Sequence, residues 1–79
     1  MPAAPTITDH RAEAFRRIVE GNLNTAFFNY GPVTLDAVLV FVNQLRPPNE
    51  SLFDRNEAIQ ALHRMYVANV IVFDGTWVT

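Results

Sequence analysis

Cysteine and lysine are both absent from this sequence of 79 residues. Without cysteine, disulfides, thiolate metal sites and cysteine nucleophiles are excluded, and a cytosolic compartment fits this composition. All six cationic side chains are arginine; with eight aspartates and glutamates they give a net charge of −2. A nucleic-acid-binding module usually has a basic surplus, because neutralising phosphate supplies most of its affinity. The charge therefore disfavours DNA as a partner.

Glycine and long apolar runs are scarce as well. Three glycines give no phosphate-cradling loop, and the longest apolar run is Ala37–Val42. That run is far shorter than the roughly 20 residues that span a bilayer. The start, Met1–Pro5, has neither the basic residues nor the apolar stretch of a signal peptide. We therefore expect a cytoplasmic protein without a membrane anchor.

Hydrophobic residues make up 49% of the chain and include six Phe, two Tyr and one Trp, which argues against disorder. The length corresponds to one small domain that buries roughly 60–65% of its unfolded surface, so its core must be efficient or shared with a second copy. A homodimer is one consequence. We assign residues 1–7 to a flexible N-terminal arm and residues 8–79 to a single domain.

The stretch Asp54–Thr79 carries the clearest local signals. Asp54 and Glu57 have the spacing of a capping box at the start of a helix. Asn69 follows the last turn of that helix, where a left-handed residue is favoured. Asp74-Gly75 separates two β-branched and aromatic runs, which predicts a tight β-hairpin. The stretch therefore predicts a capped helix followed by a hairpin.

Spacings of three and four in the first third of the chain predict one continuous helix over about residues 8–29, with a break at Gly21-Asn22 as the alternative. Its helix cap is Thr6 or Thr8. Phe28 would lie opposite the apolar face of an unbroken helix, as an exposed or partner-contacting aromatic, but would join the core if the helix bends. The expected apolar face is Ala12, Phe15, Ile18, Val19, Leu23, Ala26, Phe27 and Tyr30.

Gly31-Pro32 ends the first helical region because proline lacks an amide donor and restricts the residue before it. Val33 is suited to a very short strand. We expect Thr34 to cap a second helix that extends to about Leu45, although residues 33–42 also read as a buried strand. The Pro-rich residues 46–51 are a loop.

The third helix is expected to turn Ile59, Leu62 and Tyr66 inward, flanked by Ala58 and Met65, and to turn Ala61 outward. Trp77 either anchors a partner or closes the core over the first helix, and we favour the second because so small a domain needs its only Trp inside. His63 is read as a partly buried histidine bonded to a neighbour.

Catalytic and metal sites find little support. His10 and Glu13 are one helical turn apart, but two ligands are too few for a metal. No hydroxyl stands in a Gly-framed elbow. Four carboxylates are available for acid–base work (Asp54, Glu57, Asp74 and Glu50), and capping and turn roles account for three of them. We expect no enzyme activity, no cofactor and no metal.

The order of helix, Gly-Pro-Val break, helix, loop, capped helix and hairpin resembles a winged helix-turn-helix domain over about residues 10–79. The resemblance rests on that topology, on DRNEAIQALHRMYVANVIVF and on the hairpin FDGTW. It implies a mainly α fold with a C-terminal β-hairpin (α+β), that is, three helices plus a wing. It also implies that the third helix reads DNA, through Arg55, Asn56, Gln60, His63 and Arg64.

Two functional hypotheses follow. The first is a small acidic winged-helix-like module that binds protein, as a phage or mobile-element regulator or inhibitor of a host protein, or that self-associates. Its contact candidates are Phe28, Trp77, Val70 and Val72. The acidic hairpin tip and the net charge favour it. The alternative is a DNA-binding transcriptional regulator that adds Arg11, Arg16 and Arg17 to the residues of the third helix.

Overall fold

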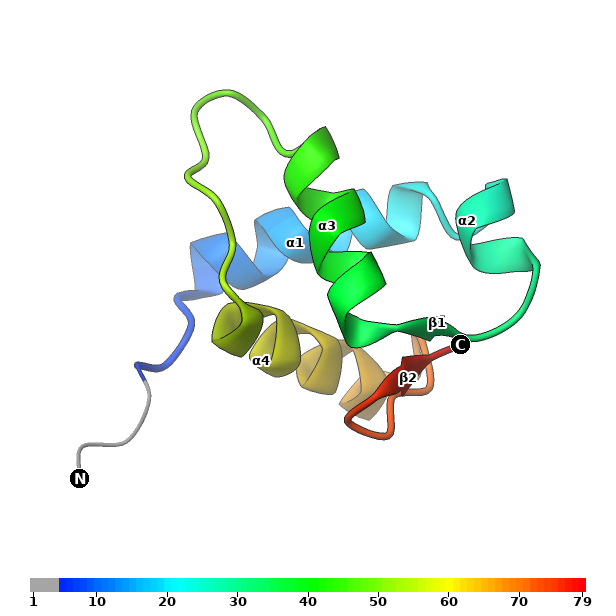
Figure 1. The fold of residues 1–79 in the computed structure, drawn as a ribbon. Helices are drawn as coiled ribbons and strands as arrows, with labels where there is room; N and C mark the ends of the chain where they lie inside the picture. Colours follow the sequence, from blue (N-terminus) through cyan, green and yellow to red (C-terminus); the bar gives the residue numbers. More distant parts are fainter. Residues whose placement is uncertain (1–4) are drawn as a thin grey trace.

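The computed structural model describes residues 5–79 and is mainly helical. Helices α1, α3 and α4 surround a common core, and a small sheet closes the end where α3 begins and α4 ends (Figure 1). This is the predicted α+β class with three helices and a wing. The elements are α1 (Asp9–Gly21), α2 (Ala26–Asn29), β1 (Val33–Thr34), α3 (Leu35–Leu45), α4 (Arg55–Val67) and β2 (Trp77–Val78).

Threonine caps begin the first two long helices. The Thr8 hydroxyl accepts a hydrogen bond from the Arg11 amide at 3.2 Å, so Thr8 and not Thr6 begins α1. The Thr34 hydroxyl accepts from the amide of Ala37 at 3.1 Å and begins α3. Each bond satisfies an amide that lacks a partner in the first helical turn. The segment after Thr34 is thus the predicted helix, and only Val33–Thr34 is a strand.

The prediction of one continuous helix to residue 29 is wrong, because α1 ends at Gly21. The Asn22 side chain donates to the carbonyl of Ile18 at 2.7 Å and so takes an acceptor that a continuing helix would use. The Thr25 hydroxyl then donates to the Asn22 carbonyl at 2.6 Å. These two local bonds hold a turn between α1 and the short α2, which was the alternative that the sequence left open.

Because the helix breaks, Phe28 packs against the core, as expected for a bent helix. Phe28 is partly buried against the core, with its ring edge-on to Phe27 at 4.8 Å and to Phe41 of α3 at 5.6 Å. Phe27 and Phe41 stack at 4.1 Å. Tyr30, expected on the inner face, is 91% exposed because the turn rotates the end of α2 outward. An aromatic cluster therefore joins α2 to α3.

Helix α4 begins with the predicted capping box. Asp54 accepts from the amide of Glu57 at 2.8 Å, and the Glu57 carboxylate accepts from the amide of Asp54 at 3.2 Å. Asn69 follows α4 with a φ of 62°, the predicted left-handed residue.

The inner face of α4 differs from the expected one. The buried residues are Ala58, Ala61, Leu62 and Met65, whereas Tyr66 is 45% exposed. Leu62, Ala58 and Met65 are buried as expected, but Ala61, expected outside, is 1% exposed, so the inner face is rotated toward Ala61 and away from Tyr66. A small side chain here lets α1 approach α4 closely, and this contact outweighs the pattern of large apolar residues.

The sheet pairs β1 with β2 in antiparallel register, Val33 with Val78 and Thr34 with Trp77. On its other side, β2 continues into the hairpin, where Phe73 faces Val78. The Asp74 amide donates to the Trp77 carbonyl at 3.3 Å, so the two loop residues are Gly75 and Thr76. Gly75 has a φ of 100°, which suits the first loop position of a type II′ turn. The predicted hairpin forms, with its two-residue loop one position further along the chain than Asp74-Gly75.

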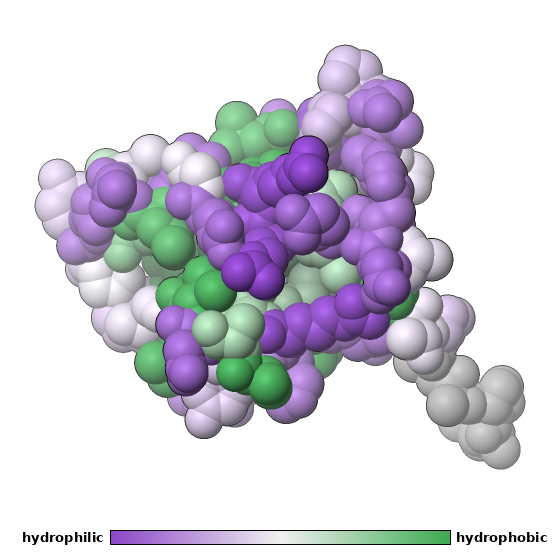
Figure 2. Space-filling view, turned by 180° about the vertical axis from the view of Figure 1, so that it is seen from behind, coloured by the Kyte–Doolittle hydropathy of each residue, from purple (hydrophilic) through white to green (hydrophobic). Residues whose placement is uncertain are grey.

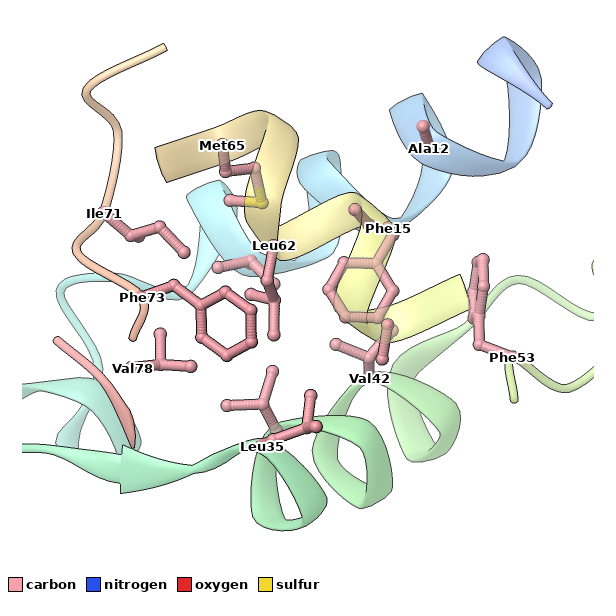
Figure 3. Packing of buried hydrophobic residues seen from close by; sticks show 14 of the residues in the cluster. Ala12, Phe15, Leu35, Val42, Phe53, Leu62, Met65, Ile71, Phe73 and Val78 are labelled. Atoms are coloured by element: carbon pink, nitrogen blue, oxygen red, sulfur yellow. The ribbon is translucent and has the colours of Figure 1, made fainter. Parts of the chain in front are cut away.

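One core joins all these elements. Figure 3 shows Leu35 of α3 and Leu62 of α4 near Phe73 and Val78 of the hairpin, and Phe15 of α1 next to Val42 and Phe53 at the other end of the same cluster. Phe53, just before α4, packs edge-on against Phe15 at 5.3 Å. Phe15, Val19, Val38, Val42, Leu62 and Val78 are all completely buried.

The chain before α1 also contributes to the core. Ile7, assigned to the arm by the sequence, is 4% exposed and belongs to the core cluster. Residues 1–4 of that arm lie outside the described residues. The segment Pro5–Thr8 runs toward α1 along α4 and bonds to its side chains, so it is part of the domain surface.

Candidate functional site

The sequence predicts two alternative binding surfaces. The outer side of α1 and α4 would bind DNA, and the hairpin would bind protein. On α1, Arg16 donates to Glu20 at 2.6 Å and Arg17 to Glu13 at 3.2 Å, both one turn apart on the helix. These charges cancel locally. Figure 2 shows the face behind that of Figure 1, with hydrophilic residues in bands and hydrophobic areas between them.

The arginines of α4 also have acidic partners. Arg55 bonds to Asp36 of α3 at 3.1 Å, and Arg64 bonds to Asp9 of α1 at 3.0 Å. All four of these groups are at least 43% exposed, so each pair adds little stability. The pairs nevertheless reduce the positive potential that would attract phosphate.

The segment before α1 covers one side of α4. The Gln60 side chain accepts from the amide of Ile7 and donates to the carbonyl of Pro5, both at 2.8 Å. Arg64 donates to the carbonyl of Ile7 at 3.3 Å. Two of the predicted DNA-reading residues, Gln60 and Arg64, thus hold the domain's own backbone. A groove-reading role would require them to exchange these partners.

The line of α4 that points farthest from the core consists of Asn56, His63 and Val67. His63 is exposed, not partly buried as expected, and its ring lies 6.5 Å from that of Tyr66. Val67 is 68% exposed. On an ideal helix these three residues lie on the side opposite the buried face, and none of them is an arginine. The structure thus brings together a mixed polar and apolar line, without the cations of a DNA-reading helix.

Sequence reasoning missed a charged cluster around Arg11, which links α1, α4 and the loop before α4. The Arg11 guanidinium donates to both carboxylate oxygens of Glu57, at 2.9 and 2.8 Å, and to the carbonyls of Ser51 and Leu52, at 2.8 and 2.9 Å. It also lies 4.1 Å from the centre of the Phe53 ring. No local spacing in the sequence indicates this cluster, because its members are some 40 residues apart.

Glu50 is the buried member of the same cluster. Its carboxylate lies 2.7 Å from Nε2 of His10 and 3.5 Å from Nη1 of Arg11. The hydrogen bond with His10, followed in effect by the charge of His10 and by Arg11, lowers the pKa of Glu50. The hydrogen bond from Arg11 is the main cause that lowers the pKa of Glu57. The cluster fastens the loop to α1, so these charges have a structural role.

A hollow beside this cluster lies between the N-terminal segment and the start of α4. Its polar side chains include Arg11, Asp54, Asn56 and Glu57. Three of the four are already engaged in the cap or the ion pair. Across residues 5–79, no group of three or more His, Asp or Glu is placed to hold a metal ion.

The hairpin presents a second surface. Trp77, expected to close the core, is 48% exposed, because its register with Thr34 turns it away from the buried Val78. Val72 is paired with Thr79 by two backbone bonds of 3.0 Å, and is 60% exposed. Alternation along the strands puts Trp77 and Val72 on the same outer face. We call this the wing face: Pro32, Thr34, Val72, Asp74, Trp77 and Thr79.

A shallow hollow lies on the wing face, lined by Pro32, Asp74, Trp77 and Thr79. The Asp74 carboxylate accepts hydrogen bonds from the amides of Thr76 and Trp77, at 2.9 and 2.8 Å. These bonds, that of Trp77 first, lower the pKa of Asp74, so the carboxylate is charged at neutral pH. The turn therefore fixes a negative charge beside an exposed indole ring.

The remaining contact candidates lie elsewhere. Val70 is partly buried against the core, and Phe28 belongs to the aromatic cluster between α2 and α3. Of the four predicted contact residues, only Trp77 and Val72 share one exposed face. Among the described residues, no helix has both the length and the apolar character needed to cross a membrane.

A family model described as "MCM3-like, winged helix domain" matches residues 5–79, which is nearly the whole chain. No curated protein and no solved structure matches the chain significantly. The matched range includes the N-terminal segment that covers α4 as well as the hairpin.

Proposed function

The chain belongs to the MCM3-like winged helix domain family, and we propose that it is a protein-interaction module that binds its partner through the wing face. In this proposal it acts by binding alone, without catalysis, cofactor or metal. The observation that carries it is the exposed pair Trp77 and Val72 on one face of the hairpin. Exposed aromatic residues of this kind are typical anchors of protein interfaces.

The distribution of charge supports this choice of partner. Five of the six arginines form ion pairs within the domain, and the sixth, Arg46, donates to the carbonyl of Asn43 at 2.9 Å. The tip of the hairpin carries Asp74, where a DNA-binding wing needs a cation. Binding to phosphate would require breaking several of these pairs with no basic surplus to drive it.

DNA binding is the second candidate, and one observation favours it: the winged helix fold presents α4 as an accessible helix. A titration with mixed-sequence duplex DNA at low and at moderate salt separates the two functions. We expect no complex even at low salt, where phosphate attracts cations most strongly. A salt-sensitive complex that Arg64→Ala or Arg55→Ala weakens would overturn the proposal.

Protein binding is tested directly by placing a photo-crosslinking residue at position 79 in the host cell, on the wing face next to the hollow, so that Trp77 itself is kept. We expect a discrete protein adduct from position 79. The matched control position is 17, on the ion-paired side of α1, which should give no such adduct. Equal labelling from both positions, or no adduct from position 79, would contradict the proposal.

The finer form of the proposal is a regulator or inhibitor that acts on a host protein, as small acidic phage or mobile-element proteins do, with self-association as the other outcome. Self-association would use the outer edge of the hairpin. Val72 and Asp74 form backbone hydrogen bonds across the hairpin. Phe73 lies between them, so its amide and carbonyl point away from β2 and, within residues 5–79, are free for a second strand. Sedimentation at high protein concentration tests this edge, and a monomer there would exclude the homodimer.

A further inference from the structure

The hollow on the wing face has the chemistry of a receptor for one cationic side chain. We propose that it binds an arginine side chain presented by the partner protein, with the guanidinium stacked on Trp77 and bonded to Asp74. This inference rests on the proposed function, because it names the chemistry by which the wing face would recognise its partner.

The first support is the state of Asp74. Six of the eight carboxylates in the chain form ion pairs, and Asp54 serves the helix cap. Asp74 has no cation within the described residues, and only its Oδ1 is engaged, by two backbone amides. The second oxygen remains available to accept a bond from a partner. Because the turn holds the carboxylate in place, little conformational freedom is lost when a cation binds.

The second support is the position of Trp77. Its ring lines the same hollow as Asp74, and its backbone amide is one of the donors that hold the carboxylate. A guanidinium attracted by Asp74 therefore meets the indole ring. The flat guanidinium stacks on aromatic rings and is less strongly hydrated than an ammonium, so arginine fits better than lysine. Such a contact supplies specificity along with modest affinity.

The third support is the apolar surroundings. Pro32 lines the hollow, and the exposed Val72 lies on the same face. An apolar residue next to the arginine of the partner would bury these side chains. The expected occupant is thus a segment with one arginine beside an apolar residue.

A second copy of this chain does not supply the arginine by simple docking, because every arginine already has a partner in its own domain. A second copy would have to break one of these contacts before its arginine reached Trp77. We therefore assign the arginine to a different protein.

The test uses the full chain and three capped peptides, Gly-Arg-Leu, Gly-Lys-Leu and Gly-citrulline-Leu. Trp77 is the only Trp, so its fluorescence and its single indole N–H resonance report on the hollow. We expect saturable binding of the arginine peptide, weaker binding of the lysine peptide, and no binding of the uncharged citrulline peptide over the same range. Equal binding of the arginine and citrulline peptides would overturn the inference.

Asp74→Asn is the decisive variant, because asparagine keeps an oxygen that accepts from the two amides but loses the charge. We expect this variant to bind the arginine peptide about threefold more weakly, a typical effect for an exposed charge contact. Unchanged amide resonances at Thr76 and Trp77 would show that the turn is intact. Glu13→Gln removes one charge from α1 and should leave peptide binding unchanged. An Asp74→Asn variant that binds as tightly as the parent would refute the assignment.

The same variant separates this inference from the proposed function. If Asp74→Asn still gives the protein adduct from position 79 in full yield, and the arginine peptide does not bind, then the wing face binds protein by other chemistry. In that case only the arginine inference fails. If position 79 gives no protein adduct in either the parent or Asp74→Asn, the proposed function itself fails.

Discussion

Arg11 and Glu57 join α1 to α4 through two parallel hydrogen bonds, 2.9 Å from Nε to Oε2 and 2.8 Å from Nη2 to Oε1. The same Oε1 also accepts from the amide of Asp54 and so takes part in the helix cap. One carboxylate therefore fixes both the start of α4 and its position against α1. The side chains of this pair are only 15% and 21% exposed, so solvent screens it less than the exposed pairs of Arg16, Arg17, Arg55 and Arg64.

We expect Arg11→Ala to lower the free energy of unfolding by about 2–3 kcal/mol, because it leaves a partly buried Glu57 without its cation. It also removes the donors to Ser51 and Leu52 and the contact with the Phe53 ring. Urea denaturation measures the effect.

Arg17→Ala is the matched control for that measurement. Arg17 is 79% exposed and pairs only with Glu13, one turn away on the same helix. Its loss should change the free energy of unfolding by about 0.5 kcal/mol or less. If the two variants are equally stable, the Arg11 cluster does not fasten the domain.

Stability should fall in acid because of the same cluster. The pKa of Glu57 lies below its ordinary value of 4.5 in the folded domain, chiefly through the hydrogen bond from Arg11. A depressed folded-state pKa gives stability that is fully present above the unfolded pKa and is lost as the pH falls through the folded one. Glu50 shifts in the same direction. The loss should therefore begin near pH 4.5 and continue below it.

Urea midpoints recorded from neutral pH to about pH 3 test this dependence. Glu57→Gln should lower stability at neutral pH and flatten the acid loss, because the titrating group is gone. Glu13→Gln, on the exposed side of α1, should keep the slope of the parent. An equal slope in the parent and in Glu57→Gln would place the acid sensitivity outside the cluster.

Local sequence patterns predicted much of this fold, since its helix starts and turns depend on nearby residues. The Thr34 cap, the capping box of Asp54 and Glu57, and the left-handed Asn69 each involve residues within one turn. The hairpin formed for the same reason, with Gly75 in the conformation that glycine adopts most easily. These contacts predict the winged helix without knowledge of the packing.

The features that the sequence did not predict depend on small energy differences or on contacts between distant residues. The end of α1 depended on whether Asn22 bonds back to Ile18 or lets the helix continue, a small difference that periodicity does not reveal. The position of Trp77 depended on its register with Thr34, and a one-residue difference moves a side chain to the other face. The Arg11 cluster depended on contacts between distant segments. Two of the predicted contact residues, Trp77 and Val72, lie on one exposed face. The proposed arginine site also depends on Asp74, whose position next to Trp77 is set by the turn and was not predicted from the sequence.

Two glycines should respond in opposite directions to alanine. Gly75 has a φ of 100°, where alanine is strained, so Gly75→Ala should lower stability by about 1 kcal/mol or more. Gly21 is the last residue of α1, with nothing within 4 Å of an added Cβ and no positive φ. Gly21→Ala should raise stability by about 0.5–1 kcal/mol. Thermal unfolding of both variants measures the two shifts, and shifts of the same sign would contradict the backbone assignment at one of them.

The N-terminal segment should loosen when Gln60 is shortened. Gln60→Ala removes the bonds to the Ile7 amide and the Pro5 carbonyl, so we expect a loss of about 1–2 kcal/mol and faster hydrogen exchange at the Ile7 amide. The Ile7 side chain is buried, so Ile7→Ala should cost more, about 2–4 kcal/mol. His63→Ala, on the exposed line of the same helix, is the control and should leave the Ile7 amide protected. Unchanged hydrogen exchange at the Ile7 amide in Gln60→Ala would mean that packing of the Ile7 side chain alone holds the segment on α4. Gln60 would then be free for another partner.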